Sequence, residues 1–345
     1  MFDKRKIAYI ALFVTVTISW GGSFLLVNDI VRDGVPIYFF LAFRFLLAFG
    51  ILFTMKRVRC EVPTSKQEYG QGILMGIIVF AAFLLQTYGA LYTTPSKNGM
   101  LTGLYVIMVP LILSVLRKIS MLRGGTPKTE QRFAWKPLAD AVVCLLGIAV
   151  LFDIFHVTDG MNQGDLLTIG AAFAFAVQFV FLERYSVRLN TWNYTSVMLL
   201  SVSVLSFIVS LSLEMDFYRS FSLSTTNLWK ILFLAAFSTA YAYWVQTYVQ
   251  SKLSAATVSI VACLESVFAV IFSIAFGYES ASTALIVGSL LIFISLLSSV
   301  AFTGKNVKKK FPKERQNKVS CTGSLIREDI HISEPQNHVN IKERE

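Results

Sequence analysis

The stretch AATVSIVACLESVFAVIFSIAF, residues 255–276, decides the fold class. A helix of about 20 apolar residues crosses the hydrocarbon core of a bilayer, and this run is of that length. It holds a single carboxylate, Glu265, near its middle. The stretch therefore predicts a membrane-spanning helix and raises the question of what an acid does at its centre.

The whole chain shares this apolar character. Of its 345 residues 55% are hydrophobic and 15% charged, and the mean hydropathy is +0.61, whereas an average soluble domain is about 25% charged. The net charge of +10 could indicate nucleic acid, but the basic residues lie in short runs beside apolar segments and form no basic face interleaved with aromatics. The composition predicts a multi-pass membrane protein and argues against nucleic-acid binding.

Ten apolar runs are long enough to be spans, and each should be a helix because hydrocarbon offers no partners to an open backbone. The first run is longer than the about 7–15 residues of a signal-peptide core, so we expect it to be retained. The predicted spans are residues 7–27, 36–55, 70–91, 97–116, 137–153, 164–182, 193–213, 228–250, 254–276 and 282–303.

The distribution of Lys and Arg predicts the orientation. Basic residues crowd the N-terminus, the 56–69 and 117–136 loops and the segment after 303, while the opposite loops hold only Arg32, Lys97 and Arg219. Since positive loops stay cytoplasmic, both termini are predicted to be cytoplasmic. The polar segment 304–345, with its lysine run, is predicted to be a disordered basic cytoplasmic tail.

The two halves of the chain look like repeats. A shift of about 155 residues places Trp20 opposite Phe175 and Ser23 opposite Gln178, and a shift of 156 places Pro110 opposite Ser266. Five spans per half is an odd number, so the second half must enter the membrane in the opposite sense, as in many transporters. We therefore divide the chain into a repeat at 1–153, an inverted repeat at 154–303 and the tail at 304–345.

Five segments of the sequence carry a resemblance to a known protein family. They are SWGGSFLLV (19–27), FLAFRFLLA (40–48), YGALYTTPSKNGMLTGLYVIMVPL (88–111), GDLLTIGAAFAFAVQFV (164–180) and YVQSKLSAATVSIVACLESVFAV (248–270). In order, spacing and duplication they resemble the EamA-type ten-helix transporters of the drug/metabolite transporter superfamily, over about residues 7–303. The resemblance implies a secondary carrier with a central cavity that opens alternately to each side, often an exporter of amino acids, other metabolites or toxic compounds.

The chain departs from the family at one motif. The family's span-9 motif reads Leu-Glu-Pro-Val, whereas residues 264–267 here read Leu-Glu-Ser-Val, and the first copy keeps Pro110 without an acid. We therefore expect the proline kink mainly in the 97–116 span.

Glu265 is the candidate for charge or proton coupling. A charge at the centre of a span costs at least about 2.5–3.5 kcal/mol, so this side chain should face the bundle interior, be protonated or be paired. It either binds a proton or substrate cation during transport, or is a structural carboxylate bonded to a neighbouring helix.

Arg44 lies deep in the second span and has three interpretations. It can complement a substrate carboxylate, hold a structural partner such as a helix carbonyl end, or pair with Glu265, which would weaken both ligand hypotheses.

Aromatic and polar residues at mid-span complete the predicted substrate cavity, although each is also explicable as packing. The substrate-cavity candidates are Trp20, Ser23, Arg44, Gln86, Tyr88, Tyr105, Phe175, Gln178, Tyr241, Tyr243, Trp244 and Gln246. The glycine pairs Gly72/Gly76 and Gly99/Gly103 are interpreted as close helix packing, and Asp165 as part of a helix N-terminal cap.

Catalysis and ATP-driven transport find no support in the sequence. The histidines are His156, His331 and His338, outside the spans, and no Gly-Lys-[Ser/Thr] triplet occurs. We expect no enzyme activity, catalytic residue, metal or cofactor. The expected partners are a small-molecule substrate and the bilayer of the plasma membrane, with a homodimer allowed. The leading hypothesis is a secondary transporter, with a lipid or isoprenoid-linked flippase as the alternative and a structural or enzymatic membrane protein less favoured.

Overall fold

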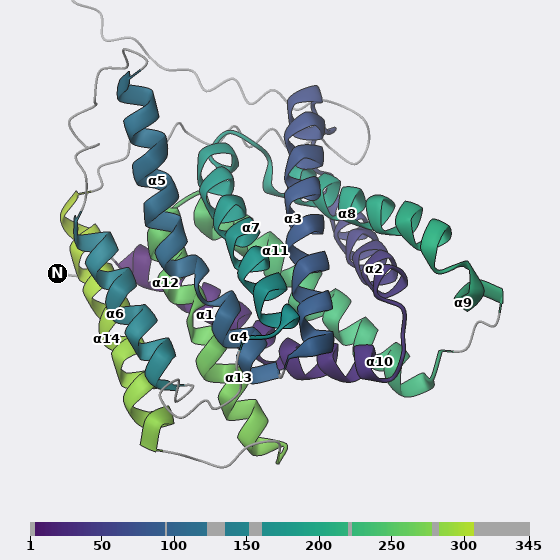
Figure 1. Cartoon of the computed structure of the whole chain (residues 1–345). Helices are drawn as coiled ribbons and strands as arrows, with labels where there is room; N and C mark the ends of the chain where they lie inside the picture. The colour runs from purple at the N-terminus through teal and green to yellow at the C-terminus, as the bar shows by residue number, and fades with distance from the viewer. Residues whose placement is uncertain are drawn as a thin grey trace, which may run out of the picture.

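The computed structural model describes residues 4–93, 95–122, 135–151, 161–219, 223–277 and 283–306, and these ranges contain helices and no strand. Figure 1 shows them as a bundle. The predicted tail lies outside the described residues from 307 onward, as do His156, His331 and His338. The first half contains α1 (Lys4–Arg32), α2 (Ile37–Val58), α3 (Lys66–Tyr92), α4 (Pro95–Thr102), α5 (Tyr105–Leu122) and α6 (Trp135–Leu151).

The second half contains more but shorter elements. They are α7 (Gln163–Ser186), α8 (Thr191–Leu213), α9 (Met215–Arg219), α10 (Thr225–Phe233), the π-helix η3 (Leu234–Tyr241), α11 (Ala242–Gln250), α12 (Ala255–Ala262), α13 (Leu264–Ala275) and α14 (Thr283–Asn306).

Eight helical segments among the described residues are long and apolar enough to cross a membrane, and they fall on eight of the ten predicted spans. The predicted spans 137–153 and 282–303 fall on α6 and α14, whose apolar parts, Leu138–Val150 and Ile286–Ser298, are shorter. These two helices pack side by side at the left edge of Figure 1. The all-helical, multi-pass class is confirmed, while the count of ten spans and the placement of the termini stay predictions.

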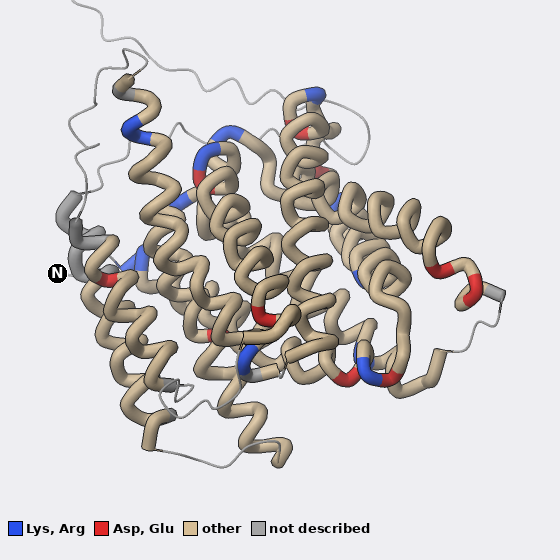
Figure 2. The backbone as a smooth tube through the Cα atoms, viewed as in Figure 1, with Lys and Arg blue, Asp and Glu red and all other residues tan. Residues whose placement is uncertain are grey.

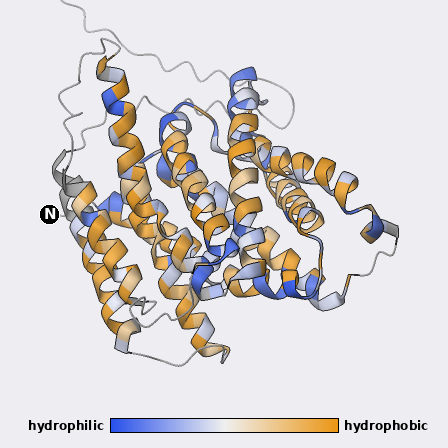
Figure 3. Ribbon diagram, viewed as in Figure 1, coloured by the Kyte–Doolittle hydropathy of each residue, from blue (hydrophilic) through white to orange (hydrophobic). Residues whose placement is uncertain are grey.

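Apolar side chains both fill the bundle and cover its outside. Figure 3 shows hydrophobic colours along the helices, with polar colours gathered at helix ends and around α4. Many large apolar side chains are exposed, among them Phe237 and Phe276 at 52% and 72%. So large an apolar surface is unfavourable in water but fits the hydrocarbon of a membrane.

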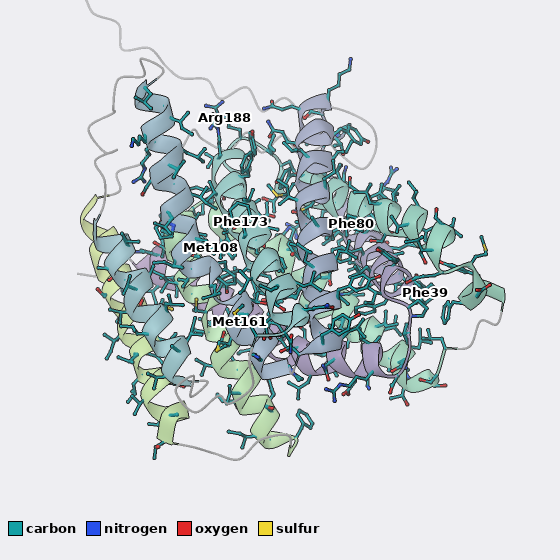
Figure 4. The ribbon with its side chains drawn as sticks, in the orientation of Figure 1. Phe39, Phe80, Met108, Met161, Phe173 and Arg188 are labelled. Atoms are coloured by element: carbon teal, nitrogen blue, oxygen red, sulfur yellow. The ribbon has the colours of Figure 1, made fainter. Side chains whose placement is uncertain are left out.

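Helix ends are satisfied by side chains from the same or neighbouring elements. Asn162 and Asp165 form a capping box at the start of α7, so Asp165 is the third residue of the helix and returns the cap bond. Pro36, before α2, gives no side-chain cap, and Glu214 replaces it by accepting the N–H of Tyr38 and of Phe39 at 3.0 and 2.8 Å. Phe39 lies beside α9 at this end of the bundle (Figure 4).

Small residues set the closest helix approaches. A Cβ added at Gly72 would lie 2.7 Å from Cγ1 of Val197, and one at Gly76 would overlap Cβ of Ser201, so α3 and α8 pack with almost no gap. Gly103 is similarly tight, since an added Cβ would lie 2.9 Å from Cδ1 of Ile148, whereas Gly99 has ordinary room. The packing interpretation is confirmed at three of these four glycines.

The fourth and ninth spans are both interrupted, which corrects the expectation of a kink mainly in the fourth. The first break lies between Thr102 and Tyr105, ahead of Pro110, which lies inside α5. The second lies at Cys263, between α12 and α13, where no proline occurs, and the Ser266 N–H donates to the Cys263 carbonyl in a tighter turn. The interruption therefore occurs in both halves, and in the second half it forms without proline.

Candidate functional site

A central cavity lies among the helices of both halves. Its lining comes from α1, α2, α3, α4 and α5 in the first half and from α7, α11 and α13 in the second. Side chains fill the remaining space between the helices (Figure 4). The space that water centres can occupy in the cavity is about 50 Å³, enough for roughly three to five water molecules.

Arg44 is the cation of this cavity. It is 2% exposed, and its Nε donates to Oγ1 of Thr239 at 2.7 Å. The guanidinium carbon lies 5.1 Å from the centre of the Phe83 ring, within cation–π range. Phe40 and Phe45 flank it at 5.9 and 5.8 Å. Arg44 forms no salt bridge with any residue that the structure describes.

Glu265 is the acid of the same cavity. It is 4% exposed, and Tyr105 donates its hydroxyl to Oε1 at 2.9 Å. No described Lys or Arg lies within ion-pair distance of Glu265, so the ion pair with Arg44 considered from the sequence does not form. A cation and an acid therefore line one cavity without neutralising each other directly.

Amide and hydroxyl groups complete the polar lining. Gln178 and Gln246 exchange amide hydrogen bonds at 3.1 and 3.3 Å across α7 and α11. Gln86 donates to Oγ1 of Thr102 at 3.1 Å. Trp20 donates its indole N–H to the Ser238 carbonyl at 3.1 Å and so ties α1 to η3.

Most of the predicted cavity residues come together and three do not. The predicted residues that line the cavity are Trp20, Ser23, Arg44, Gln86, Tyr105, Phe175, Gln178, Tyr243, Gln246 and Glu265.

Tyr88, Tyr241 and Trp244 do not line it. On α3 and α11 the positions that face the cavity recur with the helical period, and Tyr88 and Trp244 fall between them, while Tyr241 is the last residue of η3. Tyr88 packs against Tyr38 with ring centres 5.9 Å apart, Tyr241 shares a hydrogen bond with Thr15 at 2.6 Å, and Trp244 stacks on Tyr248 at 5.7 Å.

Sequence reasoning missed eight lining residues. They are Phe24, Val27, Phe83, Thr87, Ala90, Asn98, Thr102 and Phe179. A signal for part of this set was present, because Gln-Thr-Tyr occurs at both 86–88 and 246–248. That spacing aligns the two breaks and places Tyr105 opposite Glu265, 160 residues apart. Matching the two breaks needs a shift of 160 and not about 155, and this longer shift places Pro110 opposite Val270 instead of Ser266.

These features define an integral membrane protein with an internal polar cavity. The family model of the EamA-like transporter family matches residues 7–123 and 162–301. The chain therefore belongs to the EamA-like transporter family and is a membrane transporter.

The chain is also similar to two known proteins. The chain is 25% identical over 300 residues to an uncharacterized transporter from Archaeoglobus fulgidus, covering 85% of this chain and 86% of that protein. It also superposes on a solved crystal structure with a TM-score of 0.67 and 16% identity, covering 87% of this chain and 99% of that one. At this identity the second likeness shows the fold alone.

Proposed function

We propose that this transporter is a secondary carrier that exports small metabolites, amino acids or drug-like compounds across the plasma membrane by alternating access, without catalytic residues or a cofactor. The observation that carries the proposal is an arginine and a carboxyl group that line one cavity without pairing with each other. A solute that bears an anionic and a cationic group can bind Arg44 with the first and Glu265 with the second, since each of these side chains makes one side-chain hydrogen bond and has no ion-pair partner among the described residues.

The lining fits the body of such a solute. Trp20, Phe83, Phe175 and Tyr243 offer aromatic surface, and the amides of Gln86, Gln178 and Gln246 offer hydrogen bonds. Small-molecule sites combine apolar and aromatic walls with placed polar groups, and this lining contains both kinds. No observation on the described residues favours the flippase alternative.

The helix contacts support two inverted halves, 1–153 and 154–303. In two equivalent halves, α8 is the counterpart of α2, and α14 is the counterpart of α6. Each helix packs on its own counterpart. Helix α1 packs on α13, and the equivalent helices of the other half, α7 and α5, also pack on each other. Helix α3 packs on α8, and the equivalent pair, η3 and α2, is likewise in contact. A cavity between two such halves is the arrangement that alternating access requires.

The size of the cavity also supports a moving site. A volume of about 50 Å³ holds a few waters but no amino acid. A substrate of amino-acid size therefore needs a conformation in which the lining side chains lie farther apart, as alternating access supplies.

The charge distribution supports the proposed orientation. Figure 2 shows basic positions gathered at the upper ends of α3, α5 and α7, and Arg188 is labelled at this end in Figure 4. By the positive-inside rule this is the cytoplasmic end.

Flux into proteoliposomes tests the function. Labelled amino acids and amphipathic cations should cross at a rate that depends on the solute, with and without an imposed pH gradient, and Glu265→Gln should change that rate. A flux that depends neither on which solute is offered nor on the pH gradient contradicts a carrier. Comparing vesicles in which the protein is inserted in opposite orientations then gives the direction of transport.

A further inference from the structure

The second half contains an irregular element that the described part of the first half lacks. Its eighth span includes the π-helix η3, Leu234–Tyr241, whereas its counterpart α3 is α-helical from Lys66 to Tyr92. Within η3 the Thr239 hydroxyl donates to the Leu234 carbonyl five residues earlier, at 2.9 Å. Such π-helical turns are rare and often occur at functional sites.

Thr239 is also the hydrogen-bond partner of Arg44. Its Oγ1 accepts from Nε of Arg44 at 2.7 Å, and the Thr239 side chain is fully buried. Arg44 makes no other side-chain hydrogen bond to the described residues, although its guanidinium lines the cavity.

Both partners occupy positions that are apolar in the other half. With the shift of 155 that relates α1 to α7, Arg44 falls opposite Leu199, and with the shift that relates Tyr105 to Glu265, Thr239 falls opposite Val79. The inverted scaffold therefore does not require either polar group, yet the two lie in contact. This points to a shared task that belongs to the cavity.

We infer that Thr239 is a positioning residue, which holds Arg44 by its Nε so that the two terminal amino groups face the cavity and receive an anionic group of the substrate. An arginine bound in this way presents the paired N–H groups that match a carboxylate. Because the long side chain is already fixed before the substrate binds, less side-chain conformational entropy is lost on binding. The inference rests on the proposed function because it names how that site selects anionic groups.

Three variants separate this role from a structural one. Thr239→Val keeps the shape and removes the hydroxyl, and Thr239→Ser restores the hydroxyl. Thr247→Val is the matched control, because Thr247 lies in α11 of the same span, is 1% exposed and accepts a hydrogen bond from Thr195 at 3.1 Å without lining the cavity.

The first readout needs no ligand. In protein with ¹⁵N-labelled arginine, the Nε–H signal of Arg44 is assigned by its loss in Arg44→Lys, and its exchange with solvent is measured. Thr239→Val should speed this exchange roughly tenfold, the effect of losing one hydrogen bond to a charged group. Thr239→Ser and Thr247→Val should resemble the wild type. Unchanged exchange in Thr239→Val overturns the inference.

The second readout uses a panel of L-amino acids and the amines that lack only the carboxylate. Thr239→Val should weaken binding of the amino acids roughly tenfold and leave the amines unchanged. Equal weakening of both sets assigns Thr239 a purely structural role and overturns the inference. If the wild type binds no amino acid, the proposed function fails, and the exchange rate still decides whether Thr239 holds Arg44.

Discussion

Replacing Gly21 with alanine should push α1 away from the helix that carries Glu265. A Cβ at residue 21 would lie 2.5 Å from Cβ of Phe268, 2.8 Å from the Glu265 carbonyl oxygen and 2.9 Å from the Ala269 nitrogen. Two of these atoms are backbone, so no rotamer change relieves the contact. Bringing the shortest of these contacts to ordinary van der Waals separation requires the two helices to part by about 0.9 Å.

Gly22→Ala is the matched control for this change. An added Cβ there would meet only the Phe272 ring, at 3.4 to 4.0 Å. Both variants gain the same helix propensity, about 1 kcal/mol, so the difference between them isolates the overpacking, about 1–3 kcal/mol.

Unfolding of the purified variants and their flux in proteoliposomes measure the effect. Gly21→Ala should be about 1–3 kcal/mol less stable than Gly22→Ala and should transport more slowly, because Glu265 is displaced. Equal stability and equal flux in the two variants would refute the predicted contact between α1 and α13.

Three further predictions concern buried polar groups. Glu265→Gln should remove any dependence of flux on a pH gradient and slow substrates that bear an amine, and unchanged flux and pH dependence would exclude a coupling role. Tyr105→Phe should lower the free energy of unfolding by about 1–3 kcal/mol, because a buried oxygen of Glu265 loses its donor; unchanged stability would mean that this bond contributes nothing. Asp165→Asn should cost about 1.5–3 kcal/mol through the lost charge next to Lys97, 2.7 Å away, whereas Asp33→Asn, 52% exposed and 4.0 Å from Lys230, should have little effect.

The sequence predicted the helical membrane fold well because span length follows from bilayer thickness. The eight helical segments that are long and apolar enough to span a membrane contain continuous apolar runs, which no other fold class explains as readily. Closely packed glycines such as Gly72 and Gly76 were also visible, since their four-residue spacing places them on one helix face.

Charged residues of the cavity were equally accessible to sequence reasoning. An acid and an arginine inside apolar spans, Glu265 and Arg44, are costly enough to indicate an interior position. Their mutual separation was not predictable, because it depends on how seven spans pack and on the Thr239 hydroxyl that holds the guanidinium.

Aromatic residues were the least predictable part of the site. Every face of a spanning helix accepts aromatic side chains, so Tyr88 and Trp244 could not be distinguished from cavity residues by composition. The π-helix was also invisible, since Leu234–Tyr241 has no proline or glycine to mark it. The break at Cys263 shows that local helix geometry here depends on tertiary packing.

The central claim is that Arg44 and Glu265 bind opposite ends of one substrate. Its most direct test measures flux of an amino acid, the amine that lacks its carboxylate and the acid that lacks its amine, through the wild type, Arg44→Gln and Glu265→Gln. Arg44→Gln should lose the amino acid and the acid but keep the amine, while Glu265→Gln should lose the amino acid and the amine but keep the acid. Two variants that lose all three solutes equally, or that transport all three like the wild type, would contradict the claim.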